Sequence, residues 1–332
     1  MFAQCLQGFR DMGREIPLRI DGLAWFAPIR ARASGFFLPS LIVAALLTLA
    51  PFAAAESMIS GGVSRQYEIF RPGGAAGALP AVLLLHGGGG TAAQLERFTD
   101  FNRVAASAGI VAVYPQGLGR EWNDRRGPGV QSQADDEQFL LDLIDWLAAK
   151  GLVDPAQVYI AGISNGGLMA LDMACGHADR IAGIAVVAAS FPVGYRCNPV
   201  QPLAVIFVHG TQDRFIPFEG GRIAGQFSAE RGNVVSAEET IDFFVRAADC
   251  RTRDQQVLPE PSPPDGTHVT IFRYGGCQGG GAVESVIVEG GGHSWPGARQ
   301  GFLLDHLLGP ASHAVDTSAE LWRFFADAAH AP

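Results

Sequence analysis

Lysine is almost absent from this chain of 332 residues, in which Lys150 is the only one. A phosphate-binding P-loop ends in Gly-Lys-Ser/Thr, so that class of nucleotide site is excluded. Acidic residues outnumber basic ones by 33 to 24, which gives a net charge of −9. Because a nucleic-acid-binding surface needs an excess of positive charge, we expect no nucleic-acid partner.

Cysteine is also scarce, with five residues spaced too widely for a C-x-x-C zinc pattern, so we expect no metal site. Only 17% of the residues are charged, whereas 48% are hydrophobic. That hydrophobic content is ample for a buried core and excludes an intrinsically disordered chain.

An apolar stretch that follows Arg32 and ends at Ala55 has the pattern of a secretory signal peptide. It predicts cleavage after Ala55, loss of residues 1–55 and a secreted or periplasmic protein without stable membrane association. An uncleaved anchor is the alternative, because the run is nearly long enough to cross a bilayer, although its two prolines argue against one. The segment before the run is long for a signal peptide, and Met12 is an alternative start.

Export would remove Cys5 and leave an even set of four cysteines, which predicts two disulfide bonds with three possible pairings. We expect bonds between neighbours in the sequence. The alternative is that some of the four are free buried thiols. The four residues are Cys175, Cys197, Cys250 and Cys277.

Short, continuous apolar runs alternate with helical patterns along the rest of the chain. The predicted strands are Ala81–His86, Gly109–Tyr114, Val158–Ala161, Ile181–Ala188, Ala204–His209 and Val283–Val288. The predicted helices are Asp135–Lys150, Asn165–Cys175, Ala237–Ala248 and Thr317–Ala329. This alternation predicts an α/β fold, a mostly parallel central sheet with helices on both faces.

No break in composition divides residues 56–332, which we expect to form a single domain. The proline-rich segment Pro259–Pro264 is interpreted as a surface loop between a helix and a strand, rather than as a domain linker. The sequence makes no prediction of the oligomeric state.

Ser164 lies at the centre of a G-x-S-x-G pattern, Gly162 to Gly166. In a chain with 42 glycines this pattern alone is weak, but a predicted strand leads into it and a predicted helix follows it. A strand, sharp turn and helix in this order expose a serine hydroxyl at the edge of a sheet. The alternative is a helix-capping serine in an ordinary glycine turn.

A nucleophilic serine needs a base, and the base needs an acid that orients it. Asp213 and His293 follow Ser164 in the order acid, then histidine, and each lies in a loop just after a predicted strand. Asp213 could instead only organise its turn. The competing histidines are His268, His306 and His313, whereas His86 is interpreted as a loop organiser and His209 as a hydrogen-bonding group within the sheet.

Acyl transfer also needs backbone N–H donors for the carbonyl oxygen. The run Gly87–Gly90 follows the first core strand, so Gly88 or Gly89 would join Asn165 in such an oxyanion hole. The same run fits the G-x-G-x-x-[GA] pattern of dinucleotide sites. The next strand, however, ends in Pro115-Gln116 instead of the acid that binds ribose, so we expect no cofactor.

With these residues placed, the chain resembles the secreted α/β-hydrolase family that groups polyhydroxybutyrate depolymerase-like esterases with feruloyl and acetylxylan esterases. The resemblance runs from about Arg65 to the last helix. It rests on the blocks LLLHGGGG, VYPQG, Trp122-Asn123, Asp135-Asp136 with Phe139, VDPAQVYIAGISNGGLMA, HGTQDRFIPFEGG and GGGHSWPG. It implies an α/β-hydrolase fold, with Ser164 as nucleophile, Asp213 as acid, His293 as base, and Gly88 with Asn165 as oxyanion donors.

Other residues of these blocks have more than one possible role. Trp122 and Trp295 are candidate walls of the substrate site, and each could equally be a packing residue. Gln138 stands where the block more often has a small residue. Asp136 is interpreted as a helix N-terminal charge rather than as a site residue.

The sequence thus predicts a serine carboxylic ester hydrolase that acts through an acyl-enzyme, on feruloyl or acetyl esters of plant polysaccharide. A depolymerase of hydroxyalkanoate oligomers is the first alternative. An inert binding protein on a hydrolase scaffold is an alternative of another class, against which the complete Ser, Asp and His set argues.

Overall fold

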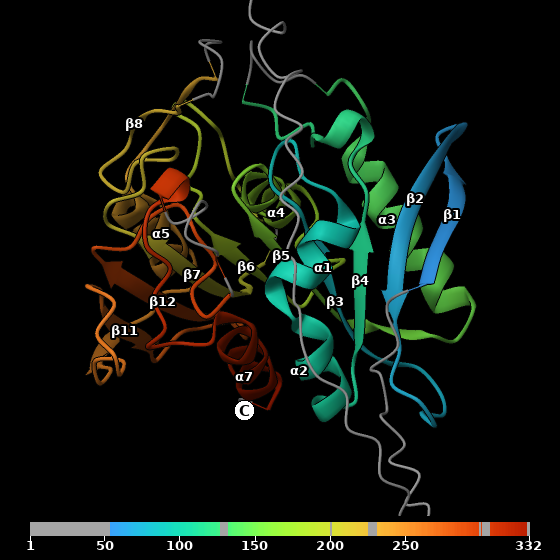
Figure 1. The fold of residues 1–332 in the computed structure, drawn as a ribbon. Helices are drawn as coiled ribbons and strands as arrows, with labels where there is room; N and C mark the ends of the chain where they lie inside the picture. Colours follow the sequence, from blue (N-terminus) through green and yellow to red (C-terminus); the bar gives the residue numbers. More distant parts are fainter. Residues whose placement is uncertain are drawn as a thin grey trace, which may run out of the picture. The chain divides into compact units, whose positions relative to one another are not determined.

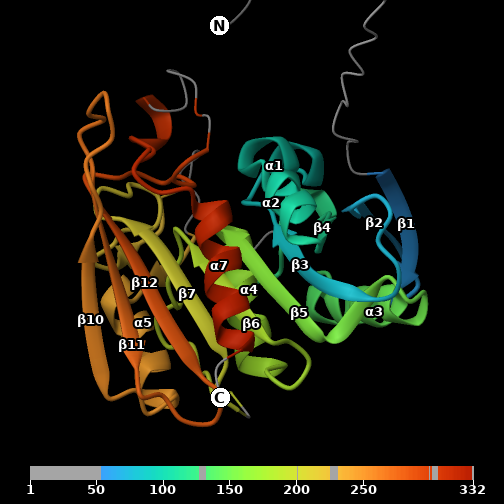
Figure 2. The same cartoon turned by 90° about the horizontal axis from the view of Figure 1, so that it is seen from below.

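The computed structural model describes residues 54–126, 132–199, 201–224, 231–298, 300 and 306–330. Ala50–Pro332 forms one compact unit. Its central sheet has ten strands in the order β1-β2-β4-β3-β5-β6-β7-β12-β11-β10 (Figures 1 and 2). The strands are β1 (Ala54–Ser60), β2 (Val63–Phe70), β3 (Leu79–Leu85), β4 (Val111–Pro115), β5 (Val153–Ile163), β6 (Gly183–Val187), β7 (Ala204–Gly210), β10 (Thr252–Val257), β11 (His268–Gly275) and β12 (Ala282–Glu289).

The six central strands, from β4 to β12 in the sheet order, are all parallel to one another. Two antiparallel strands extend the sheet at each edge. A short ribbon of β8 (Gly221–Arg222) and β9 (Asn233–Val234) lies apart from it. This arrangement confirms the predicted α/β class with a mostly parallel sheet. The carboxyl ends of the parallel strands therefore meet at one edge, where α/β proteins place their ligand sites.

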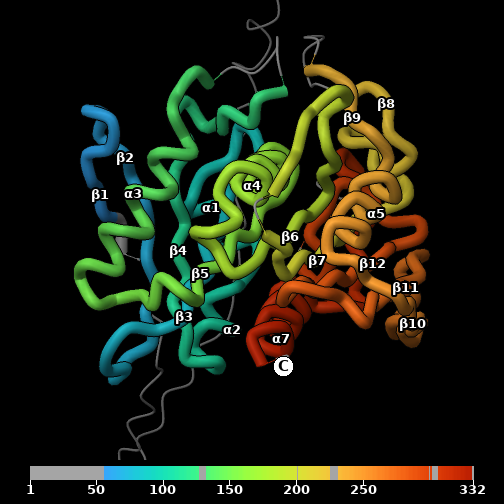
Figure 3. The backbone as a smooth tube through the Cα atoms, turned by 180° about the vertical axis from the view of Figure 1, so that it is seen from behind, coloured from blue at the N-terminus to red at the C-terminus, as the bar shows by residue number. Residues whose placement is uncertain are grey.

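Helices cover both faces of the sheet (Figures 2 and 3). Leu83 and Leu85 of β3 pack in one buried cluster with side chains of α3, α4 and α5, whereas Leu84 packs in a second cluster with α1, α2 and α7. Alternate residues of a strand point to opposite faces, so a strand covered on both faces must be apolar throughout. The helices are α1 (Ala92–Thr99), α2 (Phe101–Ala108), α3 (Asp136–Ala149), α4 (Asn165–Gly176), α5 (Ala237–Ala247) and α7 (Thr317–Ala329), with a 3₁₀ turn η1 (Leu118–Arg120).

Every strand and helix predicted from the sequence overlaps an observed one, and the bounds predicted for α7 are the observed bounds. The interpretation of Pro259–Pro264 is wrong in one respect. This segment is a loop, but it connects the antiparallel strands β10 and β11 rather than a helix and a strand. Because β10 is exposed along its whole length, its sequence lacks the apolar alternation that marks a half-buried strand.

The predicted leader, residues 1–55, lies outside the described residues except for Ala54 and Ala55, which begin β1. Cleavage after Ala55 stays a prediction. It would shorten β1 by two residues at its start and leave Glu56 to Ser60 paired with β2.

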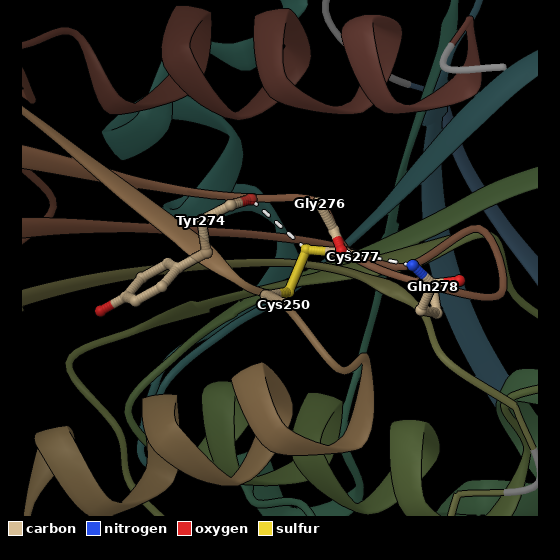
Figure 4. The surroundings of a disulfide bond; sticks show 5 residues. All are labelled: Cys250, Tyr274, Gly276, Cys277 and Gln278. Atoms are coloured by element: carbon tan, nitrogen blue, oxygen red, sulfur yellow. Dashed lines mark hydrogen bonds between the residues drawn. A yellow bond between two sulfur atoms is a disulfide. The ribbon is translucent and has the colours of Figure 1, made fainter.

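Two disulfide bonds join the neighbouring cysteines, as expected. Cys175 near the end of α4 is bonded to Cys197, and Cys250 after α5 is bonded to Cys277. In Figure 4 the second bond lies at the end of β11, where the Cys277 sulfur is 3.4 Å from the carbonyl oxygen of Tyr274. The first bond ties α4 to a loop and fixes the end of this helix that is far from Ser164, whereas the second bond joins two loops.

Replacing both Cys175 and Cys197 with serine is expected to lower the free energy of unfolding by about 3 kcal/mol, because the bond closes a loop of 22 residues in the unfolded chain. Urea unfolding, followed by circular dichroism at equal protein concentration, measures this difference. A loss below about 1 kcal/mol would show that the bond contributes little to stability.

Candidate active site

Ser164 occupies a sharp turn between β5 and α4. Its φ of 57° and ψ of −122° lie in a region that side chains with a Cβ rarely adopt. The backbone N–H of Ser164 donates to the Val187 carbonyl of β6 at 2.9 Å, which ties the turn to the neighbouring strand. The turn therefore holds the serine in a strained position at the carboxyl edge of the sheet.

The glycines on either side of Ser164 are needed because other backbone atoms approach them closely. A Cβ on Gly162 would lie 2.1 Å from the Gly166 carbonyl oxygen, and a Cβ on Gly166 would lie 2.3 Å from the Leu85 carbonyl oxygen. Neither distance is possible for a real side chain. The G-x-S-x-G pattern thus reflects a turn packed against the end of β3.

His293 and Asp213 form a hydrogen-bonded pair after neighbouring strands β12 and β7. His293 Nδ1 lies 2.7 Å from Asp213 Oδ2. The other carboxylate oxygen, Oδ1, accepts the backbone N–H groups of Phe215 at 2.8 Å and Ile216 at 2.9 Å. Both side chains are buried, with His293 8% and Asp213 6% exposed. The loop after β7 therefore fixes the carboxylate, which in turn orients the imidazole.

Burial by itself would raise the pKa of Asp213, but the charge of His293 and the hydrogen bonds from His209 and His293 outweigh it. The pKa is therefore well below its ordinary value of 3.8, and the carboxylate stays ionised. His209 Nε2 lies 3.0 Å from the Ile216 carbonyl oxygen. The expectation that His209 bonds within the sheet is thus wrong, because its ring supports the loop that carries Asp213.

The competing histidines lie elsewhere in the described part of the chain. His268 is on β11, where it pairs with Glu260 at 3.3 Å. His306 and His313 line neither of the two cavities at Ser164. His86 instead organises its loop, since its Nε2 accepts the Gly117 backbone N–H at 3.0 Å.

The glycine loop after β3 leaves a defined set of free donors. The N–H of Gly89 donates to the Arg120 carbonyl at 2.8 Å, and that of Gly90 donates to the Gly87 carbonyl at 2.9 Å. Among the described residues, the N–H groups of Gly88 and Asn165 have no acceptor. Of the two glycines considered from the sequence, Gly88 therefore keeps the N–H that an oxyanion could use.

Two cavities meet at Ser164 and His293. We call the first, of about 230 Å³, the apolar cavity, because its lining includes Leu95, Phe98 and Ile163. The second, of about 360 Å³, we call the charged cavity, because it is lined by Glu121, Arg126 and Arg231. Gly88, Ser164, His293 and Leu308 line both. The Ser164 hydroxyl makes no hydrogen bond with another described residue.

The sequence analysis did not predict that Glu121, Arg126 and Arg231 belong to the site, and it did not predict α1. Glu121 directly precedes the Trp122-Asn123 block, which is the one signal that could have drawn attention to it. Nothing in the sequence around Arg231 distinguishes it from other surface arginines. Leu95 and Phe98 belong to α1, an element that the sequence analysis did not predict.

The Asn165 side chain connects the turn at Ser164 to the loop after η1. Its Oδ1 accepts the Trp122 backbone N–H at 2.7 Å, while Nδ2 donates to the Trp122 carbonyl at 3.0 Å and to Asp124 Oδ2 at 2.6 Å. Asn165 is 2% and Asp124 1% exposed. This buried clasp holds the Glu121 loop against the start of α4.

The expectation that Trp122 and Trp295 form walls of the substrate site is wrong for the cavities described, because neither indole lines them. Trp122 is fully buried, and its Nε1 donates to the His86 carbonyl at 2.9 Å. Trp295 is 1% exposed, and its Nε1 donates to Ser318 at 3.1 Å. Both indoles are packing residues.

Asp136 has a structural role beyond that of a helix N-terminal charge. Its Oδ1 lies 2.5 Å from Nη2 of the buried Arg65, and its Oδ2 accepts the Asn123 backbone N–H at 2.8 Å. It thereby joins β2 and α3 to the loop that carries Glu121, and it lines neither cavity. Gln138 donates to Asp142 at 2.7 Å on an exposed face of α3.

Within the described ranges, no three His, Cys, Asp or Glu side chains gather where they could hold a metal ion. No helix in those ranges combines the length and the apolar character that crossing a bilayer requires.

Comparison with known proteins gives consistent matches. Residues 99–193 match the prolyl oligopeptidase family. The chain is 31% identical over 279 residues to the putative esterase NocK of Nocardia uniformis subsp. tsuyamanensis, covering 79% of this chain and 81% of that protein. It is 28% identical to feruloyl esterase B of Piromyces equi, covering 68% of this chain and 41% of that enzyme.

The crystal structure of a thermostable esterase has the same fold, with a TM-score of 0.50, 18% sequence identity and coverage of 82% of this chain and 62% of that one. The strand order, the turn at Ser164 and the match to NocK along most of both chains all lead to the same family assignment. The chain is a carboxylic ester hydrolase and belongs to the family of α/β-hydrolase esterases that includes NocK.

Proposed function

We propose that this protein is an exported serine esterase that hydrolyses feruloyl or acetyl esters of plant polysaccharide through an acyl-enzyme. The observation that carries the proposal is that Ser164 and His293 line the same two cavities while His293 is hydrogen-bonded to Asp213 at 2.7 Å. A nucleophile, a base and an orienting acid are the groups that ester hydrolysis through serine needs.

In this mechanism the Ser164 hydroxyl attacks the ester carbonyl while its proton passes to His293. Because Nδ1 of His293 faces Asp213, Nε2 is the nitrogen that accepts the proton. Catalytic hydrogen bonds often tighten only when substrate is bound, so the Ser164 hydroxyl need not contact His293 beforehand. Asp213 stabilises the imidazolium that forms.

The carbonyl oxygen becomes negative during the attack, and the N–H groups of Gly88 and Asn165 are its proposed donors, each worth about 3 kcal/mol. The alcohol then leaves with the proton from His293, and Ser164 carries the acyl group. Water, deprotonated by His293, attacks the acyl-enzyme, and the acid leaves as the proton returns to Ser164.

Two observations favour these esters as substrates. Feruloyl esterase B of Piromyces equi and the bifunctional acetylxylan esterase/xylanase XynS20E of Neocallimastix patriciarum are among the similar proteins. The apolar cavity beside Ser164 offers Leu95 and Phe98 to an aromatic or acetyl group.

Export is supported by the leader pattern and by the two disulfide bonds, which form in oxidising compartments.

A hydrolysis panel of methyl ferulate, acetylated xylan and hydroxybutyrate oligomers tests this function. We expect turnover of at least one of the first two, at a higher kcat/KM than for the oligomers. Faster hydrolysis of the oligomers would favour the depolymerase alternative. A failure of a fluorophosphonate probe to label the protein, together with no turnover in the panel, would favour an inert binding protein.

A further inference from the structure

Glu121 places a carboxylate directly beside the glycine loop. A Cβ on Gly88 would lie 2.8 Å from Oε2 and 3.0 Å from Oε1 of Glu121, which shows how closely the carboxylate approaches this loop. Glu121 is 7% exposed, and it lines the charged cavity together with Ser164 and His293. Its carboxylate therefore lies at the wall of the cavity in which the ester is cleaved.

This carboxylate has no hydrogen-bond donor among the described residues, and it faces the charged cavity. Burial raises the pKa of Glu121, and the charges of Arg231 and Arg126 only partly oppose it. Because no protein donor occupies it, the carboxylate can accept hydrogen bonds from a molecule bound in the cavity. The site thus selects for a ligand that donates hydrogen bonds.

The charges next to Glu121 further limit the chemical class of ligand that can bind. Arg126 is bound to Asp124, with its Nε 2.7 Å from Oδ2, whereas Arg231 makes no hydrogen bond or salt bridge with another described residue. Asp124, which does not line the cavity, neutralises Arg126, so Glu121 and Arg231 remain on the wall as one acidic and one basic group. An ammonium group would be repelled by the arginines and a carboxylate by Glu121, so a neutral group with both donors and acceptors fits best.

We propose that Glu121 and Arg231 hold hydroxyl groups of a sugar that forms the alcohol side of the ester. This assignment rests on the proposed function. Each sugar hydroxyl can donate to the carboxylate and accept from a guanidinium group, which matches the pair of side chains. The acyl group then occupies the apolar cavity, because the two cavities meet at Ser164 and an ester has one group on each side of its carbonyl.

The experiment compares two esters with the same acyl group, 5-O-feruloyl-L-arabinofuranose and methyl ferulate. We expect the wild-type protein to prefer the sugar ester, and Glu121→Gln to lower the ratio of the two kcat/KM values about tenfold, mainly through KM for the sugar ester. Arg231→Gln should lower the same ratio, and it tests the subsite independently should Glu121→Gln fail to fold. Glu68→Gln, at a half-buried position on β2 away from both cavities, is the matched control.

The possible outcomes separate the two proposals. If both esters are hydrolysed but neither variant changes the ratio, the sugar subsite is overturned and the esterase function stands. An equal loss with both esters in Glu121→Gln would also overturn it, because that pattern indicates damage to the oxyanion donors at Gly88. If the wild-type protein hydrolyses neither ester, while a fluorophosphonate probe leaves Ser164 unlabelled, both proposals fail.

Discussion

Ser164→Ala is expected to lower kcat by about 10⁵- to 10⁶-fold for every ester that the wild-type protein hydrolyses, because no other group can form the acyl-enzyme. Stability should stay within about 1 kcal/mol of wild type. The Ser164 hydroxyl makes no hydrogen bond with another described residue, and alanine has the same Cβ at the strained φ of 57°. The loss is therefore one of chemistry and not of folding.

Initial rates with methyl ferulate, urea unfolding and mass spectrometry after fluorophosphonate treatment measure this prediction together. Ser190→Ala is the matched control, since Ser190 is fully buried, its hydroxyl has no hydrogen-bond partner among the described residues, and it lines neither cavity. That variant should keep full activity and be labelled once. A Ser164→Ala protein with more than about one hundredth of the wild-type kcat would refute the covalent mechanism.

The central sheet could be predicted from the sequence because its parallel strands are mostly buried on both faces and consist largely of apolar residues. The edge strands could not. All six residues of β10 are exposed, and its stability comes from pairing with β11, a contact that no local pattern reveals. Helices α1 and α2 are each only eight residues long, too short for a clear helical period.

The same distinction applies to the site. Ser164, Asp213 and His293 could be proposed because each follows a strand of the sheet, and the carboxyl ends of parallel strands meet at one edge. Glu121 and Arg231 come from irregular loops, whose paths depend on tertiary contacts such as the Asn165 clasp. For Trp122 and Trp295 the sequence predicted site residues that the structure places in the packed interior. An aromatic residue beside a motif can pack beneath a site as readily as line it.

Asp213→Asn is expected to lower kcat about 10⁴-fold, with a smaller effect on KM. The reason lies in the hydrogen bonds around the carboxylate. The N–H groups of Phe215 and Ile216 both donate to Oδ1, so in the variant they would bind the amide oxygen there. The amide NH₂ would then face His293 Nδ1 and favour the tautomer with its proton on Nε2. That nitrogen could no longer accept the proton of Ser164.

Initial rates and urea unfolding across a pH series test this account, with Asp254→Asn on the exposed strand β10 as control. The folded pKa of Asp213 is below its ordinary value of 3.8, so its ionised form stabilises the protein above that value. This contribution is lost as the pH falls through the folded pKa. The difference in unfolding free energy between wild type and Asp213→Asn should therefore shrink only in strong acid. A kcat of Asp213→Asn within tenfold of wild type at neutral pH would contradict the role of Asp213.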